Sequence, residues 1–168
     1  MSTWGPDTFG EPCGGCGFSW TIAFDDATAL QRGIPETYMT ALAGATGTER
    51  LPGLTWSVGS YVCHVADNLR IWAERLAGVA AGATPDVAAY DENDLAAVRG
   101  YEHIALSAAL WSLRRAVVDW LAAVEEARPA GVVLHHPQRG ELRLIDVVRT
   151  NTHDAVHHAW DVRRTLHR

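Results

Sequence analysis

The chain has 168 residues, of which 48% are hydrophobic and seven are Trp, and this composition suits one domain with a single sizeable core. Its formal net charge is -6 with the histidines neutral, and the Arg residues are scattered among acids, which argues against a nucleic-acid-binding protein. The sequence has no uninterrupted apolar run of about 18 residues and no N-terminal basic region followed by a hydrophobic one. We therefore expect a soluble cytoplasmic protein that binds neither nucleic acid nor a membrane.

Residues 1–20 are rich in Gly and Pro and carry the pair Cys13-Gly-Gly-Cys16. Irregular structure is expected there, as an extension before a single helical domain at 21–168. A Cys-x-x-Cys pair is typical of half a zinc knuckle or of a redox pair. Cys63 is the only other cysteine, so a four-cysteine site cannot form, and three cysteines do not make a secreted disulfide framework. The favoured interpretation is an ordered lid or wrapping segment whose cysteines do no chemistry, and metal capture or a disulfide is the alternative.

Helical periodicity begins after a short helical turn predicted within residues 24–31. Ile34-Pro35 starts a helix that is predicted to run to about Ala45, since proline is favoured in the first turn. A Gly- and Pro-containing loop leads to a second helix at about 57–81, whose apolar residues recur every three or four positions. After a connection at 82–91, Asn93 or Asp94 offers an N-cap. A third helix is predicted at about 95–127, ended by Arg128-Pro129.

The rest of the chain predicts a short hairpin and a last helix. Beta-compatible runs flank a Pro/Gly turn in VVLHHPQRGELRL, so a β-hairpin is expected, with His135 and His136 on opposite faces. The final helix is predicted from about Leu144 to Leu166. Four main helices and no strong sheet pattern predict an all-α fold: a four-helix bundle with a long second-to-third connection and a short β-hairpin before the last helix.

Candidate metal ligands lie in the stretch TNTHDAVHHAWDVRR of the last helix. His153 and His157 are four residues apart, so both imidazoles project from nearly the same side of the helix, one turn apart. His64 lies at the edge of the core-facing stripe of the second helix, from where it is expected to supply a third nitrogen. Three neutral imidazoles suit zinc with an open coordination position, and also nickel, iron or manganese.

The runs CGF, WSVGSYVCHVADNLRIWAERL and HDAVHHAWDVRR resemble the DinB/YfiT-like superfamily, which includes mycothiol-dependent maleylpyruvate isomerases and thiol S-transferases. The resemblance covers most of the chain, up to Arg164. It implies a four-helix bundle and a divalent metal bound by three histidines, which fall here on His64, His153 and His157. Because members of the superfamily vary in activity, the resemblance implies the metal more strongly than any substrate.

Three classes of function follow. The first is a metal-dependent transferase or isomerase that uses mycothiol or another low-molecular-weight thiol on a small electrophilic metabolite. The second is a metal-dependent hydrolase, in which HDAVH is a variant of HExxH and Asp154 is the general base. The third is a non-catalytic metal- or ligand-binding protein linked to stress.

Other residues have weaker predicted roles. Arg149, one turn before His153, is a candidate for contact with a substrate carboxylate or for a surface salt bridge. Asp67 and Asp161 lie one turn beyond His64 and His157, and each is expected either to accept a ring N–H or to be a solvated charge. His158 points about 100° away from His157 and is not expected to be a ligand. The Trp residues permit a hydrophobic face for a homodimer, although core filling is the larger expectation.

Overall fold

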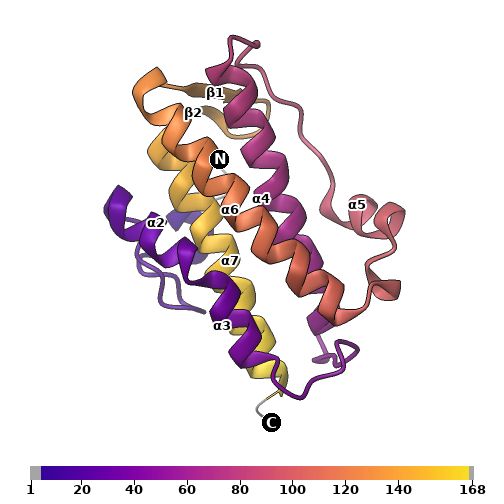
Figure 1. Cartoon of the computed structure of the whole chain (residues 1–168). Coiled ribbons are helices and arrows are strands. Elements are labelled where there is room, and N and C mark those ends of the chain that lie inside the picture. Colours follow the sequence, from indigo (N-terminus) through magenta and orange to yellow (C-terminus); the bar gives the residue numbers. More distant parts are fainter. Residues whose placement is uncertain (1–4, 167–168) are drawn as a thin grey trace.

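The computed structural model describes residues 5–166 of the chain. These residues form seven α-helices, one 3-10 helix and one two-stranded antiparallel hairpin (Figure 1). In chain order the elements are α1 (Pro6–Phe9), α2 (Phe24–Arg32), α3 (Ile34–Ala41), α4 (Val58–Ala80), α5 (Glu92–Arg99), η1 (Tyr101–His103), α6 (Leu106–Ala130), β1 (Val133–His136), β2 (Gly140–Arg143) and α7 (Leu144–Leu166). The predicted all-α class is confirmed.

The bundle is formed by α4, α6, α7 and the pair α2–α3, which run side by side along its length (Figure 1). Helix α4 begins after Ser57, whose hydroxyl accepts a hydrogen bond from the Ser60 amide and caps the first turn. Its three- and four-residue apolar spacing places one continuous stripe in the core, as predicted. The largest fully buried side chains include Trp72 of α4, Trp120 of α6 and Tyr38 of α3.

The predicted third helix, at about 95–127, is wrong as one continuous element. The structure divides this stretch into α5, η1 and α6, and α5 ends at Gly100, which adopts a left-handed conformation with φ 64°. Ile104 is then extended before α6 begins. Glycine adopts this conformation without a steric penalty, and it commonly ends helices in this way. The N-cap also differs, because the Asp91 carboxylate accepts the amides of Asn93 and Asp94.

Two other helix ends differ from expectation. The first predicted helix ends at Ala41 rather than near Ala45, and the preceding turn is a complete nine-residue helix, α2. Helix α6 continues past Pro129 to Ala130, and Gly131 ends it in the left-handed conformation. Proline close to the C-terminus removes only one hydrogen bond from the helix, and a left-handed glycine is a stronger stop.

The hairpin and the last helix are confirmed at their predicted positions. β1 and β2 pair from Val133 opposite Arg143 to His136 opposite Gly140. His136 is buried and His135 is exposed, so the two rings lie on opposite faces. The His135 backbone also forms an isolated bridge with Asp86, which fastens the connection between α4 and α5 to the hairpin.

The N-terminal segment folds back onto α7. Cys13, Phe18 and Trp20 are buried in a small apolar cluster with Phe9 and Ile22 at its border. This cluster is separate from the main core. The part of the predicted 1–20 extension that falls on residues 1–4 lies outside the described residues, as do residues 167–168. Residues 5–23 therefore form an ordered cover over one face of the last helix.

Gly59 on α4 offers a stability test. A Cβ at this position would lie 2.8 Å from the Gly47 carbonyl oxygen and 3.3 Å from its Cα, both backbone atoms. Overpacking of this kind costs about 1–3 kcal/mol, which exceeds the gain of at most about 1 kcal/mol from replacing a helical glycine by alanine. Gly59→Ala is expected to lower the free energy of unfolding by about 1 kcal/mol net, measured by urea denaturation.

Gly78 on the same helix is the matched control. The nearest atom to a Cβ there is the Ala83 Cβ at 3.8 Å, an ordinary van der Waals contact. Gly78→Ala should therefore raise stability by about 0.5–1 kcal/mol. Equal effects of the two substitutions would contradict the close approach of the loop to α4.

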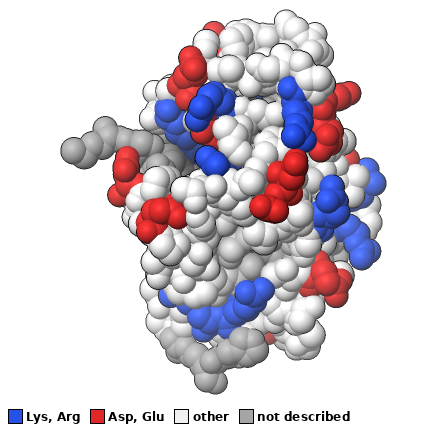
Figure 2. Space-filling view, turned by 90° about the vertical axis from the view of Figure 1, so that its left-hand side faces the viewer, with Lys and Arg blue, Asp and Glu red and all other residues white. Residues whose placement is uncertain are grey.

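Charged groups of both signs are interspersed on the surface face in Figure 2, without a broad patch of one sign. Ion pairs on the protein surface include Arg115 with Asp119 and Arg128 with Asp25. None of the helices between residues 5 and 166 is long and apolar enough to cross a membrane.

Candidate metal centre

A cavity of about 600 Å³ lies at the centre of the candidate site. Its walls come from α4, α7, the start of α5, the hairpin and the N-terminal segment. Its ionisable lining residues are His64, Arg75, Tyr61, Tyr90, Asp91, Glu92, His136, Arg139, His153, Asp154, His157, His158 and Asp161. All three predicted histidine ligands therefore line the same cavity.

Three side chains in this wall come together as a possible ligand set: His64 from α4 and Asp154 and His158 from α7. The Nε2 atoms of His64 and His158 each lie 3.5 Å from the same oxygen, Oδ1 of Asp154. Asp154 and His158 are four residues apart, so they project from one side of α7 toward α4. The two imidazole rings meet edge to face, with centroids 5.0 Å apart.

Asp161 orients the His158 ring from behind. Its Oδ2 lies 3.0 Å from His158 Nδ1, while its Oδ1 accepts two hydrogen bonds from Arg164, at 3.0 and 2.6 Å. A proton held on Nδ1 by this carboxylate makes Nε2, on the Asp154 side of the ring, the nitrogen that would bind a cation after losing its own proton. Asp161 thus accepts a ring N–H as predicted for one of its two alternatives, but from His158 and not from His157.

The neighbours of Asp154 favour the ionised form of its carboxylate. Burial opposes ionisation of Asp154, but the charges and hydrogen bonds of His64 and His158 outweigh it, so its pKa lies well below the usual value. Burial likewise lowers the pKa of His158, and the two carboxylates Asp154 and Asp161 outweigh it, raising that pKa to about 9. The site therefore concentrates negative charge around one imidazole.

Asn68 holds the other oxygen of Asp154. Its Nδ2 donates to Asp154 Oδ2 at 3.0 Å and to Asn151 Oδ1 at 3.2 Å, and its own Oδ1 accepts from the Tyr90 hydroxyl at 3.0 Å. These bonds orient the Asn68 amide and the Tyr90 phenol. They also leave Oδ1 of Asp154 directed toward His64 and His158. A carboxylate fixed in this way is poised as a monodentate ligand.

These three side chains fit a divalent cation. Ligand atoms around a tetrahedral ion with bonds of about 2.0–2.1 Å lie about 3.3 Å apart, close to the 3.5 Å separations between each Nε2 and Asp154 Oδ1. The donor set of two imidazoles and one carboxylate occurs with zinc and with other first-row divalent ions. Three protein ligands leave a position open, and here it would face the cavity.

His153 and His157 lie in a different group. Their imidazoles approach Cys13 and Cys16 of the N-terminal segment, and the ligand atoms of the four residues all lie within 4.8 Å of one another. Among residues 5–166, the ligand atoms of His64, His153 and His157 do not form such a group. The reason is helical geometry, since successive side chains on a helix diverge by about 100°. The pair His153 and His157 therefore faces a different neighbour from the pair Asp154 and His158. The three-histidine centre stays a prediction without support from this arrangement.

Arg149 fastens the N-terminal segment. Its Nε and Nη2 donate to the Ile22 carbonyl at 2.9 and 2.8 Å, and Nη2 also lies 3.2 Å from the Thr21 carbonyl. Arg149 is not part of the cavity lining. Its guanidinium is therefore engaged by backbone, and its contact with a substrate carboxylate stays a prediction.

Asp67 does not orient His64. Its carboxylate accepts from the Tyr101 hydroxyl at 2.8 Å and pairs with Arg70 and Arg99, both at 3.1 Å. It therefore ties η1 and the end of α5 to α4, which is a structural role. The solvated alternative is also wrong, because Asp67 is only 4% exposed.

His158 was not expected to be a ligand, and metal binding by Cys13 and Cys16 was only the less favoured alternative. Asp154 and His158 have the same four-residue spacing as His153 and His157, so the periodicity held two candidate pairs on adjacent stripes of one helix. Likewise, Cys-x-x-Cys together with His-x-x-x-His already contains four zinc ligands. Each group combines histidine with another residue type, cysteine in one and aspartate in the other, so the histidine spacing alone does not reveal either group.

Comparisons with known proteins agree with the fold. The chain matches the model of the DinB superfamily over residues 28–162, which leaves the N-terminal segment outside the match. Its structure is similar to that of YfiT from Bacillus subtilis, described as a probable metal-dependent hydrolase with an unusual four-helix bundle topology. The TM-score is 0.72 at 18% sequence identity, over 87% of this chain and 90% of YfiT. A search of curated proteins gave no significant match. By the extent of its match to the family model, this chain belongs to the DinB superfamily.

Proposed function

We propose that this protein is a metal-dependent enzyme in which His64, Asp154 and His158 hold a divalent ion. Its reaction joins a small, anionic electrophile to a low-molecular-weight thiol. The observation that carries the proposal is the convergence of two imidazole nitrogens on one ionised carboxylate, at the wall of a cavity of about 600 Å³. When bound, the ion would supply a Lewis acid that polarises the electrophile and favours the thiolate form of the nucleophile. Zinc suits this ligand set, with nickel, iron or manganese as alternatives.

The chain's own residues position these ligands and exclude water. Asp161 holds the Nδ1 proton of His158, and Asn68 holds Oδ2 of Asp154. The Trp56 ring packs on His64 with centroids 4.8 Å apart, and the Tyr61 ring packs on His158 at 4.9 Å. These aromatic covers restrict access to the cavity side of the site, where electrostatic interactions are stronger because water is reduced.

Two guanidinium groups favour an anionic substrate. Arg75 and Arg139 line the same cavity and lie over the Trp72 ring, at 4.6 and 5.5 Å from its centroid. Burial lowers the pKa of Arg139 to about 10 and also lowers that of Arg75, so both cations are partly desolvated. A carboxylate on the substrate would compensate this cost by charge-assisted hydrogen bonds.

The thiol class is supported by the size of the cavity and by the resemblance noted from the sequence. A volume of about 600 Å³ lies within the range for pockets that enclose one drug-sized ligand, which is compatible with a small thiol of the mycothiol type. Hydrolysis, with water in place of the thiol, is the second candidate, and the description of YfiT favours it. In that reaction Asp154 was the predicted general base.

The position of Asp154 changes how these candidates are distinguished. Because its carboxylate contacts both His64 and His158, Asp154→Ala would damage the ligand set whichever nucleophile is used. Product analysis is therefore the discriminating experiment. We would incubate zinc-containing protein with small carboxylate-bearing electrophiles, with and without a low-molecular-weight thiol, and identify products by mass spectrometry.

The expected result is a thiol adduct or a thiol-dependent isomer, formed faster with the free carboxylate than with its neutral methyl ester. A hydrolysed product formed equally without thiol would establish the second candidate in place of the first. Absence of turnover under both conditions would overturn the enzyme proposal and favour a metal- or ligand-binding protein. His158→Ala, analysed in parallel, controls for reaction that does not depend on the site.

A further inference from the structure

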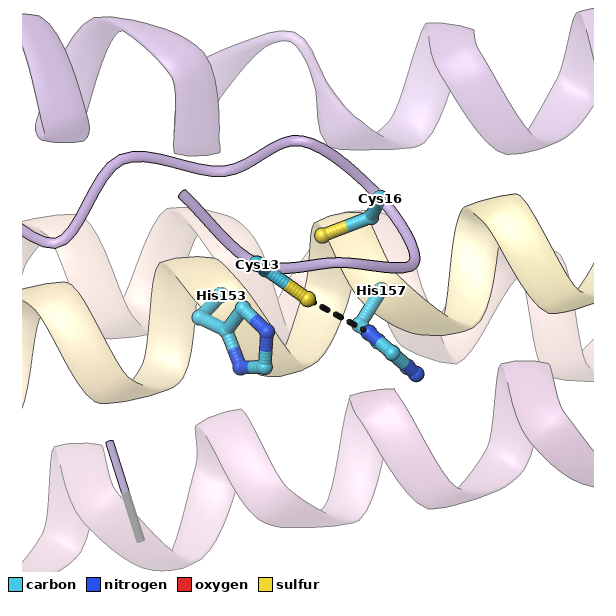
Figure 3. A group of neighbouring side chains, drawn as sticks. All are labelled: Cys13, Cys16, His153 and His157. Atoms are coloured by element: carbon cyan, nitrogen blue, oxygen red, sulfur yellow. Dashed lines mark hydrogen bonds between the residues drawn. The ribbon is translucent and has the colours of Figure 1, made fainter. Parts of the chain in front are cut away.

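Cys13, Cys16, His153 and His157 form a second cluster of potential metal ligands. Both cysteines belong to the N-terminal loop, and both histidines lie on α7, on the face that this loop covers. Figure 3 shows the two sulfur-bearing side chains and the two imidazoles gathered between the loop and the helix. Their ligand atoms lie within 4.8 Å of one another. Two segments far apart in sequence thus contribute two potential ligands each.

The spacings match a zinc site of the two-cysteine, two-histidine type. The cysteines are separated by two residues and the histidines by three, as in such sites. The Cys13 sulfur lies 3.5 Å from His157 Nδ1. Bond lengths of about 2.3 Å to sulfur and about 2.0–2.1 Å to nitrogen in a tetrahedron predict a sulfur–nitrogen separation of about 3.5 Å. The loop is therefore already arranged at the spacing of a coordinated pair.

His153 supplies an independent observation. Its side chain is buried, with 4% exposure, and its Nε2 atom has no hydrogen-bond partner. The rings of Phe9, Phe18 and Trp20 surround it, with centroids at 4.7, 5.4 and 4.3 Å from the imidazole. A buried polar nitrogen without a partner is costly, and coordination to a cation is one way to satisfy it.

Gly15 permits the close approach of the loop. A Cβ at this position would lie 3.1 Å from His157 Cε1 and 3.2 Å from the Trp160 ring. The Gly14-Gly15 backbone between the cysteines can therefore lie directly against α7, which brings both sulfurs to the histidines. A larger residue at position 15 would have to displace the His157 ring.

We propose that Cys13, Cys16, His153 and His157 bind a structural zinc ion that fastens the N-terminal segment to α7. Four protein ligands leave no open position, so this ion would not take part in the reaction. Its effect is on shape, because Phe9 of the fastened segment lines the cavity that also contains His64, Asp154 and His158. The proposal does not depend on the activity proposed above.

Cobalt(II) is the probe for this site, because its thiolate complexes show a charge-transfer band in the near ultraviolet. The full-length protein, stripped of metal and kept reduced, would be titrated with cobalt(II). We expect this band in the wild type and its loss in Cys13→Ser and Cys16→Ser. Cys63→Ser is the matched control, since Cys63 is buried on α4 away from the cluster, and it should leave the band unchanged. His64→Ala should also retain it, which separates this site from the proposed catalytic one.

A second measurement identifies the atoms bound to zinc directly. X-ray absorption of the zinc-containing wild type at one equivalent of metal, in a His158→Ala background if both sites fill, should show two sulfur neighbours per zinc. The proposal is overturned if the wild type shows no thiolate–cobalt band, if the band survives in Cys16→Ser, or if zinc has no sulfur neighbour. A Cys13–Cys16 disulfide in freshly isolated protein, revealed by thiol titration after denaturation, would also overturn it.

Discussion

His158→Ala is expected to abolish most of the activity while leaving the thiolate site intact. This substitution removes one of the three groups proposed to hold the catalytic ion, and metal-dependent polarisation supplies several kcal/mol of barrier reduction. The expected decrease in kcat/KM is therefore about 10³-fold or more. Steady-state kinetics with the best substrate from the product analysis would measure it, and the cobalt–thiolate band should persist.

His153→Ala is the matched comparison on the same helix. In the arrangement described here it should lose the cobalt–thiolate band and retain an ion at His64, Asp154 and His158. The three-histidine prediction expects the opposite, with His153→Ala removing the catalytic ion and His158→Ala sparing it. Metal content and the cobalt spectrum of the two variants distinguish the two arrangements directly. Loss of turnover in His153→Ala, with activity unchanged in His158→Ala, would contradict our grouping.

Asp161→Ala is expected to weaken metal binding at the catalytic centre by about 10–100-fold. Asp161 contacts His158 Nδ1 at 3.0 Å and is itself held by Arg164. Without this acceptor the His158 ring can rotate, or its neutral form can hold its single proton on the nitrogen that faces Asp154, and either change must be reversed before a cation binds. Competition with a chromophoric chelator would measure the dissociation constant.

Two further variants control this experiment. Asp161→Asn keeps an oxygen that can accept the His158 N–H, so it should recover part of the affinity. Asp119→Ala removes an exposed carboxylate of α6 that pairs with Arg115, and it should leave binding unchanged. Circular dichroism would verify that all variants fold. Equal affinity in the wild type and Asp161→Ala would show that Asp161 does not position His158.

Most of the fold could be predicted because its causes are local. The apolar spacing of α4 and the paired β-runs before α7 each lie within one element, and both were placed within about a residue of their observed ends. The helix break at Gly100 was not predicted, because local pattern does not reveal it. An isolated glycine within a periodic stretch is tolerated in many helices, and only the route of the chain through η1 to α6 shows that this one is left-handed.

The candidate site was predicted in part. His64, His153 and His157 all line the cavity, and residue type and helical spacing make them visible in the sequence. Their joint binding of one metal ion stays a prediction. Asp67 was misassigned because a one-turn spacing from His64 does not reveal that Tyr101, Arg70 and Arg99 occupy its carboxylate. Those partners arrive from elements whose packing no local pattern encodes.

The amino-acid pattern alone determines that α7 carries two interleaved pairs, His153 with His157 and Asp154 with His158, because both depend only on a four-residue spacing. Which partners each pair meets depends on the rotation of α7 about its own axis, and the packing of α4 and of the N-terminal segment against it sets that rotation. This rotation turns one pair toward His64 and the other toward Cys13 and Cys16. A difference of about 100° between neighbouring side chains thus separates the proposed catalytic centre from the proposed structural one.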